Sequence, residues 1–411
     1  MKKLLITCIL SSVLFSLYTQ NVKKVVRDDN YWGQVANYDE NKIPPYTLPD
    51  PLICNDGERI TNIAQWENIR RPELLQLLTT YMYGKTPALT HALPWKVDTI
   101  DTKALGGKAV RKVIELQLTN QKNGPVMHLQ IWLPKVVKQS IPLFLGMSFT
   151  PNWKISTAPE WPIRKLLAHG YGLATFLYTE ISPDGKGTSD YSKGIMPWYY
   201  RKGQTQPDPD QWGDIAVWAW AASRAMDYLQ TDAQIDGNRV ALIGHSRLGK
   251  ATLWAGACDE RFKVVFPVNS GCCGVSLSKR LIGETPTSVN HMFPAWFNGN
   301  FKQFSDREDM MPFDQHSVIA LIAPRPIYIA DAEADNWGDQ KGEFLAAKAA
   351  EPVYALYGKA GIGTNTMPPL DIAYNKGYIA YHIRKGPHAV LEYDWYQFIR
   401  FADRFLKTGS D

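Results

Sequence analysis

Apolar and polar residues alternate in three successive segments in the first third of the chain. These segments, residues 95–100, 109–118 and 127–133, have the period of two that half-buried strands require. Only short connections separate them, so we expect them to pair as antiparallel neighbours. Residues 142–147 and 172–178 are instead continuously apolar, which is typical of strands buried on both faces of a sheet.

Helical spacing of apolar positions becomes prominent farther along the chain. Residues 214–229 repeat apolar side chains every three or four positions, which predicts a helix packed on the core. Residues 63–83 also have a helical pattern, with Pro72 placed to start a second helix. Short apolar runs then alternate with further helical segments. We predict strands at 240–243, 264–268, 326–330 and 379–383, and helices at 161–169, 250–257, 316–322, 341–356 and 391–406.

Antiparallel strands followed by alternating strands and helices indicate a mixed sheet, parallel in its centre and covered on both faces. This is the architecture of an α/β-hydrolase, which is the fold class that we predict. Two long irregular segments, residues 182–210 and 271–309, interrupt the alternation, and connections of that length often carry function. Open α/β sheets bind ligands beyond the carboxyl ends of their strands, so we expect both insertions at that edge.

The connection between the strand at 240–243 and the helix at 250–257 reads Gly244-His-Ser-Arg-Leu-Gly249. A serine flanked by glycines between a strand and a helix is typical of a nucleophile elbow, which lifts the hydroxyl over the sheet edge. The spacing is Gly-x-Ser-x-x-Gly rather than the common Gly-x-Ser-x-Gly, so Ser246 as an ordinary turn serine remains an alternative. The strand and helix around it favour the nucleophile.

The other members of a triad must follow the serine in the order acid, then histidine. His388 lies in the loop between the last strand and the last helix, which is the expected place of the base. The acid should follow the strand at 326–330, where Asp335 is our choice and Glu333 the second. We expect Asp331 to be structural and Asp339 to face solvent. The acid would hold the imidazole in one tautomer and stabilise its charged form.

Composition narrows the class of protein. The 411 residues carry a net charge of +5 that is spread along the chain, which gives no indication of a nucleic-acid surface. Fourteen Trp and 20 Tyr would suit stacking on sugar rings as well as core packing. No His or Cys spacing indicates a metal site, so we expect neither a metal nor a cofactor.

The amino-terminal segment predicts export. Two lysines and an apolar run to about residue 17 are typical of a secretory signal peptide, too short for a confident membrane span. We therefore predict a signal peptide at 1–20, an extended Pro-rich lead-in at 21–60 and one catalytic domain at 61–411. The expected product is a monomer in the periplasm or outside the cell, with no membrane contact once the signal is removed. The cysteines at 54, 258, 272 and 273 form no disulfide framework, although one pair is possible.

Several strings together resemble the glucuronoyl esterases, carbohydrate esterase family 15. The similar segments are GHSRLGKATLWAGACDERF at 244–262, GET at 283–285, IALIAPRPIYIADAEADNWGD at 319–339, GPHAV at 386–390, WGDIAVWAWAASRAMDYLQTD at 212–232 and LPDPLICNDG at 48–57. Their order and spacing cover most of residues 47–408. The resemblance implies hydrolysis of esters between (4-O-methyl-)glucuronic acid on xylan and an alcohol, including lignin alcohols.

The resemblance also implies roles for particular residues. Ser246 would be the nucleophile, His388 the base and Arg247 the oxyanion residue. Residues implied to bind the glucuronate are Lys250, Glu284 and Trp337, with Arg280 as a further candidate. Each of them alone could equally be a solvated or packing residue.

The sequence departs from the family pattern at two places. Many members carry a glutamate after the strand that follows the elbow, where this chain has Asn269, so the role of the acid falls on Asp335. Fungal members have cysteines beside the nucleophile and the base, where this chain has His245 and Ala389, so that disulfide is absent.

Two other functions stay open from the sequence. One is a different carbohydrate esterase, such as an acetyl xylan esterase, although such an enzyme would need less positive charge beside the elbow than Arg247 and Lys250 supply. The other is a carbohydrate-binding protein built on an inactive hydrolase scaffold. The serine, acid and histidine in triad order argue against the second.

Overall fold

A computed structural model provides the structure of the chain and describes residues 36–89, 92–137 and 139–407. Its centre is a nine-stranded sheet with the order β1-β2-β3-β5-β4-β6-β7-β8-β9. β1, β2, β3 and β5 pair as antiparallel neighbours, and the remaining pairs are parallel. The α/β-hydrolase fold class is confirmed. The strands are Trp95–Lys103 (β1), Ala109–Gln117 (β2), Val126–Pro134 (β3), Ile141–Ser148 (β4), Gly172–Leu177 (β5), Ile235–His245 (β6), Phe262–Val268 (β7), Ile327–Ala332 (β8) and Ile379–Arg384 (β9).

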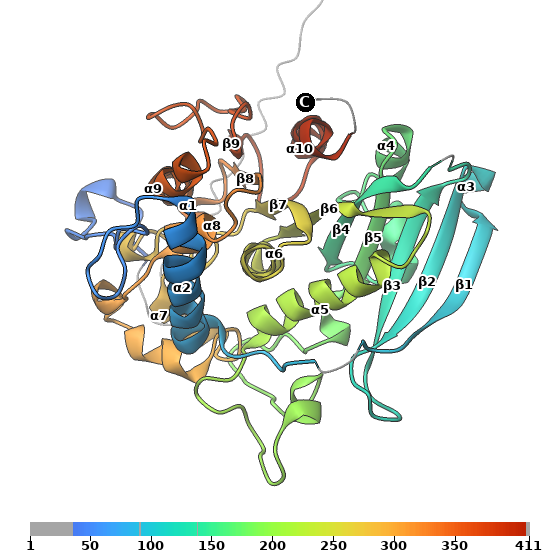
Figure 1. Ribbon diagram of the computed structural model, residues 1–411, viewed down its shortest axis with the longest axis horizontal. Helices are drawn as coiled ribbons and strands as arrows, with labels where there is room; N and C mark the ends of the chain where they lie inside the picture. Colours follow the sequence, from blue (N-terminus) through green and yellow to red (C-terminus); the bar gives the residue numbers. More distant parts are fainter. Residues whose placement is uncertain (1–35, 90–91, 138, 408–411) are drawn as a thin grey trace, which may run out of the picture.

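Helices cover both faces of this sheet (Figure 1). One core joins the sheet to α2 (Arg71–Leu78), α5 (Asp214–Leu229), α6 (Arg247–Cys258), α8 (Gln315–Ala320) and α9 (Gln340–Leu356). The opposite core joins it to α4 (Ile163–Ala168) and α10 (Glu392–Leu406). Successive residues of a strand point to opposite faces, so Leu242 of β6 belongs to the first core and Ile243 to the second. Shorter helices are α1 (Ile63–Gln65), α3 (Ala104–Gly107) and α7 (Pro286–Met292).

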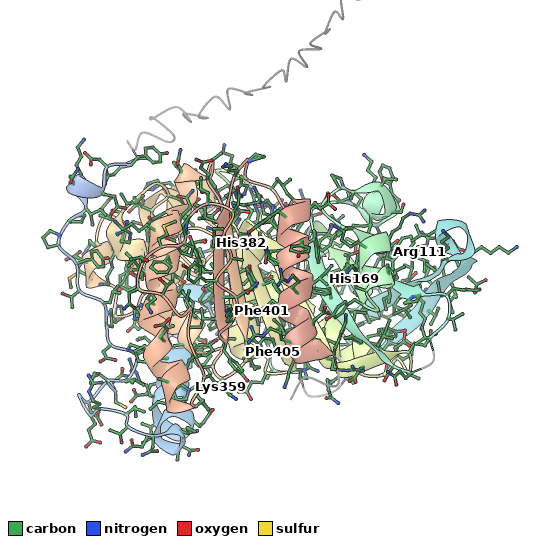
Figure 2. All side chains as sticks on the ribbon, turned by 90° about the horizontal axis from the view of Figure 1, so that it is seen from above. Arg111, His169, Lys359, His382, Phe401 and Phe405 are labelled. Atoms are coloured by element: carbon green, nitrogen blue, oxygen red, sulfur yellow. The ribbon has the colours of Figure 1, made fainter. Side chains whose placement is uncertain are left out.

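The closing helix α10 lies across the second face. Figure 2 looks onto this face and marks Phe401 and Phe405 on the helix. Phe401 is fully buried, and its ring meets the ring of Phe266 on β7 edge to face. The predicted helix at 391–406 is therefore confirmed as an element that packs on the sheet.

Residues 63–83 differ in detail from the sequence prediction. Pro72 lies in the first turn of α2, as predicted, but no break precedes this helix: α1, a π turn at Trp66–Arg70, α2 and a second π turn at Thr79–Tyr83 follow one another directly. A π turn bonds to the fifth residue rather than the fourth. The helical segment thus continues through Pro72, with one π turn before α2 and another after it.

The predicted signal peptide at 1–20 lies outside the described residues. In the part of the chain from 36 onward, the lead-in contacts the domain, since the Pro49 carbonyl lies 2.7 Å from His316 Nε2. Within the described ranges, no helix has the length and apolar character needed to cross a bilayer. The four cysteines at 54, 258, 272 and 273 are free, with 3.6 Å between the sulfurs of the last two.

Candidate active site

The residues between β6 and α6 form a sharp turn around Ser246. Its backbone has φ 59° and ψ −128°, a left-handed conformation that is costly for a residue with a side chain. A Cβ atom on Gly244 would lie 2.3 Å from the Leu248 carbonyl oxygen, and one on Gly249 would lie 2.9 Å from the Val268 carbonyl oxygen. The second glycine therefore lets α6 approach the end of β7, which explains the longer Gly-x-Ser-x-x-Gly spacing.

The predicted acid and base meet across two neighbouring connections. His388, in the loop after β9, has Nδ1 2.5 Å from Oδ2 of Asp335, in the loop after β8. Glu333, the second choice for the acid, is exposed on the surface. Burial raises the pKa of Asp335, but the hydrogen bond and charge of His388 and the Asn269 amide lower it more, so that it lies below its ordinary value. The Asp335 carboxyl group is therefore ionised at neutral pH.

Two neighbouring carboxyl groups are instead protonated, because burial raises their pKa values. Burial raises the pKa of Asp331 well above its ordinary value and that of Glu343 to about 8. Asn269 Nδ2 donates to Oδ1 of Asp331 and lies 3.4 Å from Oδ2 of Asp335. Asn269, which stands where many family members have a glutamate, therefore contacts both aspartates. Of these two aspartates, Asp335 is the charged one, and it is the one that contacts the His388 imidazole.

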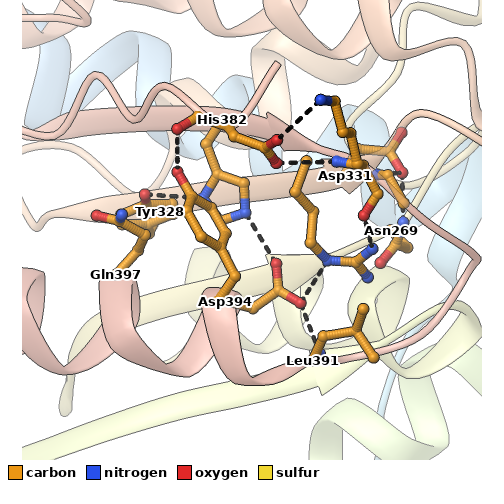
Figure 3. Close-up of polar contacts among 12 residues, drawn as sticks. Asn269, Tyr328, Asp331, His382, Leu391, Asp394 and Gln397 are labelled. Carbon is orange, nitrogen blue, oxygen red and sulfur yellow. Dashed lines mark hydrogen bonds and ion pairs between the residues drawn. The ribbon is translucent and has the colours of Figure 1, made fainter. Parts of the chain in front are cut away.

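A buried network joins β9 to the start of α10, and Figure 3 shows His382, Asp394 and Leu391 in it. Asp394, in the first turn of α10, accepts from His382 Nε2 at 2.9 Å and from Arg384 Nε at 2.7 Å. The same Arg384 guanidinium donates to the carbonyl oxygens of Pro387 and Ala389, on either side of His388. Asp394 also accepts from the Leu391 backbone N–H at 2.7 Å. These bonds hold the loop through its backbone, while the His388 imidazole itself contacts Asp335.

Ser246, Asp335 and His388 line one pocket with a volume of about 370 Å³. The pocket lies at the carboxyl ends of the parallel strands, as predicted. Three of the predicted binding residues, Lys250, Glu284 and Trp337, line it as well. Its other lining residues are Asp184, Lys186, Arg247, Asn269, Ser270, Gly271, Met292, Phe293, Trp296 and Gly338.

Lys250 and Glu284 form a buried ion pair in this pocket. Lys250 Nζ lies 2.9 Å from Glu284 Oε2 and also donates to the carbonyl oxygens of Ser270 and Cys272. Burial lowers the pKa of Lys250, but the charge of Glu284 raises it more, so the net shift is upward. The ammonium is therefore charged and keeps the Glu284 carboxylate in the wall of the pocket.

Arg280 does not belong to this pocket. Its guanidinium is buried and pairs with Asp339, Nε to Oδ2 at 2.8 Å, and with Glu40 at 2.5 Å. Asp339 was expected to face solvent, but it is buried, and its side chain accepts from the Gly342 N–H at the start of α9. We correct both predictions: these residues tie the lead-in and α9 together beside the site.

His245 contacts the base. Its ring centroid lies 4.5 Å from that of His388, and its Nε2 atom is buried without a hydrogen-bond partner. Burial and, second, the charge of His388 lower the pKa of His245 from 6.5 to about 3. The ring is therefore neutral, and it lies beside the base.

Replacing His245 by Phe should make stability less sensitive to acid. The unfolded chain binds a proton at this residue below pH 6.5, whereas the folded protein does not until about pH 3, so the free energy of unfolding falls as the pH falls through that window. At pH 5 the His245→Phe variant should retain roughly 1–2 kcal/mol that the parent loses relative to pH 7. Urea unfolding at both pH values measures this. An identical pH slope in the two proteins would show that His245 titrates normally.

Comparison with known proteins identifies the family. A model of fungal glucuronyl esterases matches residues 118–358. The carbohydrate esterase MZ0003 of an unknown prokaryotic organism is 42% identical over 407 residues, covering 91% of this chain and 93% of that protein. The chain belongs to the glucuronoyl esterases, carbohydrate esterase family 15. It is thereby a carboxylic ester hydrolase.

Two further relatives of this glucuronoyl esterase extend the comparison. The structure of a glucuronoyl esterase from Solibacter usitatus superposes with a TM-score of 0.84 at 42% identity, over 90% of this chain and all of the other. A 4-O-methyl-glucuronoyl methylesterase from Schizophyllum commune is 26% identical over 321 residues, 76% of this chain and 74% of that protein. The likeness thus covers most of the chain and includes both bacterial and fungal proteins.

The glucuronoyl esterase pocket also contains residues that the sequence did not single out. Asp184 accepts from Tyr178 Oη at 2.7 Å and from Trp296 Nε1 at 3.1 Å, and it pairs with Arg247. The Arg247 guanidinium lies 4.9 Å from the ring of Trp296 and 5.0 Å from that of Phe293. Asp184, Phe293 and Trp296 come from the two long insertions, whose length was the only sequence signal for them. In the described ranges, no group of three or more His, Cys, Asp or Glu side chains is placed to hold a metal.

Proposed function

We propose that this protein hydrolyses esters of D-glucuronic acid, including 4-O-methylated ones, by a serine acyl-enzyme mechanism. The observation that carries the proposal is the Asp335–His388 contact at 2.5 Å in the pocket that also contains Ser246, Lys250 and Glu284. A triad supplies the chemistry of ester cleavage. The charged pair on the pocket wall supplies polar groups for a sugar.

In the proposed first half-reaction, Ser246 Oγ attacks the C6 carbonyl carbon and His388 Nε2 takes the serine proton. Negative charge then develops on the carbonyl oxygen, which the backbone N–H of Arg247 at the start of α6 and its guanidinium stabilise. Collapse breaks the bond from C6 to the alcohol oxygen, and His388 gives its proton to that oxygen. Asp335 keeps Nδ1 protonated and stabilises the charged ring throughout.

In the second half-reaction water replaces the alcohol. His388 takes a proton from the water, the hydroxide attacks C6, and the proton passes to Ser246 Oγ as the acyl bond breaks. Free glucuronate and the regenerated enzyme result.

We assign sugar recognition to the part of the pocket that Lys250, Glu284 and Trp337 line. The Glu284 carboxylate accepts hydrogen bonds from ring hydroxyls, and Lys250 holds that carboxylate in place and carries the balancing charge. Trp337 presents an apolar face to the ring. The Arg247 side chain is braced by Asp184 and two aromatic rings, so it acts without reorganising.

The proposed natural substrate is the ester between glucuronoxylan and lignin alcohols, met outside the cytoplasm by a monomeric enzyme. The predicted signal peptide supports export. The names of the relatives, which are carbohydrate and methylglucuronoyl esterases, support the glucuronate portion. Acetyl xylan esterase activity is not favoured, because the small acetyl group offers nothing for Lys250 and Glu284 to recognise.

A substitution of Glu284 tests the sugar assignment. The wild-type enzyme should release methanol from methyl D-glucuronate and little acetate from acetylated xylan. Glu284→Gln should raise KM for methyl glucuronate at least tenfold, because a hydrogen bond to a charged acceptor is lost. Its kcat/KM for p-nitrophenyl acetate should stay within about twofold, because that ester has no sugar.

Kinetics on both esters, with circular dichroism as a check of folding, measure the effect. Equal losses on the two esters would assign Glu284 to the general structure of the pocket. Faster release of acetate than of methanol by the wild-type enzyme would favour the acetyl xylan esterase.

A further inference from the structure

The ammonium group of Lys250 is held mainly by the backbone of one turn. An ammonium has three donors and no acceptor, and Lys250 Nζ donates to Glu284 Oε2 and to the carbonyl oxygens of Ser270 and Cys272. Both carbonyl groups belong to the turn at residues 270–276, which follows β7. The position of the Glu284 carboxylate, which Lys250 contacts, therefore depends on this turn.

Glu343, in the first turn of α9, holds the same turn from its other side. The Glu343 side chain is fully buried, and its Oε1 atom accepts from the Gly271 backbone N–H at 2.9 Å. This N–H and the Ser270 carbonyl belong to one planar peptide unit, in which the N–H and C=O groups point in opposite directions. The peptide unit is thus fixed between Glu343 at its N–H and Lys250 at its C=O.

Glu343 makes this contact as an uncharged acceptor. Burial raises the pKa of Glu343 to about 8, although the hydrogen bond from Gly271 acts in the opposite direction, and the charge of Asp335 adds to the increase. Its other oxygen, Oε2, is buried without a hydrogen-bond partner, which costs less for a neutral carboxyl group than for a carboxylate. A glutamine therefore has the shape, the charge and the acceptor atom that this position requires.

We propose that Glu343 is a positioning residue for sugar recognition, acting on Glu284 through the Ser270–Gly271 peptide and Lys250. The inference rests on the proposed glucuronate esterase activity. Among the described residues, those that line the pocket do not include Glu343, so it acts without touching the substrate. Because Glu343 is neutral, a neutral replacement leaves the charge around Asp335 unchanged, and the effect falls on KM rather than on kcat.

Glu343→Met and Glu343→Gln separate the acceptor atom from the rest of the side chain. Both replacements are uncharged and close to glutamate in length, but only glutamine offers the Gly271 N–H a strong acceptor. We expect Glu343→Met to raise KM for methyl glucuronate about fivefold, the effect of one lost hydrogen bond, with kcat within about twofold. Glu343→Gln should keep the wild-type KM within about twofold. For p-nitrophenyl acetate, which has no sugar, kcat/KM should change by less than about twofold in both variants.

Glu351→Met is the matched control on the same helix. Glu351 Oε1 also accepts from a backbone N–H, that of Ile362 at 2.8 Å, but Ile362 lies in the connection after α9 and does not line the pocket. This variant should leave KM for methyl glucuronate unchanged. In a Glu284→Gln background, Glu343→Met should raise KM by less than about twofold more, because both changes weaken the same contact with the sugar.

Steady-state kinetics on both esters, with circular dichroism as a check of folding, measure these effects. Equal losses on the two esters in folded Glu343→Met, or a full fivefold further rise in the Glu284→Gln background, would overturn the proposal. A fivefold rise of KM in Glu343→Gln would overturn it as well, even if Glu343→Met does not fold. If the wild-type enzyme does not cleave methyl glucuronate, the proposed function itself fails, so the two failures are distinguishable.

Discussion

Ser246→Ala should abolish ester hydrolysis, with kcat on methyl glucuronate reduced by about 10⁵- to 10⁶-fold. Loss of the nucleophile removes the acyl-enzyme route altogether, and the remaining oxyanion donors support only slow attack by water. The fold should be unaffected, because alanine keeps the backbone bond from residue 246 to the Val268 carbonyl oxygen at 2.8 Å. Methanol release under single-turnover conditions, beside circular dichroism, measures both.

Ser270→Ala is the matched control for this substitution. Ser270 places a second hydroxyl in the same pocket, but its Oγ accepts from the Val275 backbone N–H at 2.9 Å. We expect this variant to keep more than a tenth of the activity. A collapse in Ser270→Ala with full activity in Ser246→Ala would reverse the assignment of the nucleophile.

Asp335→Asn should lower kcat by about 10⁴-fold with little change in KM. The amide is close in shape to the carboxylate, but it no longer stabilises the charged imidazole, and it favours the wrong tautomer of His388. Asp335 lies only 2.5 Å from Nδ1 of that ring, so the full electrostatic contribution is lost. Steady-state kinetics from pH 5 to pH 9 measure the effect.

Glu333→Gln is the control for the acid. Glu333 is an exposed carboxylate two residues earlier in the same loop, and its backbone N–H donates to the Arg384 carbonyl oxygen at 2.7 Å, a bond that the variant keeps. Its activity should match that of the wild-type enzyme within about twofold. An Asp335→Asn variant with more than a tenth of the normal kcat would contradict the proposed acid.

The elements and the order of the candidate triad could be predicted from the sequence because both depend on local pattern. Residues 214–229 have strong helical spacing, and the structure places α5 at the same residues. Ser246, Asp335 and His388 follow predicted strands, and a parallel sheet brings the ends of its strands to one edge. The structure accordingly places all three in one pocket.

The rest of the site depends on contacts that local pattern does not contain. Asp184 and Trp296 are more than 100 positions apart, yet they form one hydrogen bond beside Arg247. Asp339 was expected to face solvent because acidic loops usually do, but Arg280 covers it.

The hydrogen bonds by which Arg384 and Asp394 position the loop of His388 affect how heat or proteolysis would inactivate this enzyme. The loop depends on the first turn of α10, because Asp394 in that turn holds Arg384. Heat or proteolysis that detaches α10 would misplace the base while the strands remain paired. Inactivation would then precede the loss of secondary structure, and a covalent link between α10 and the sheet would extend the lifetime of the active enzyme.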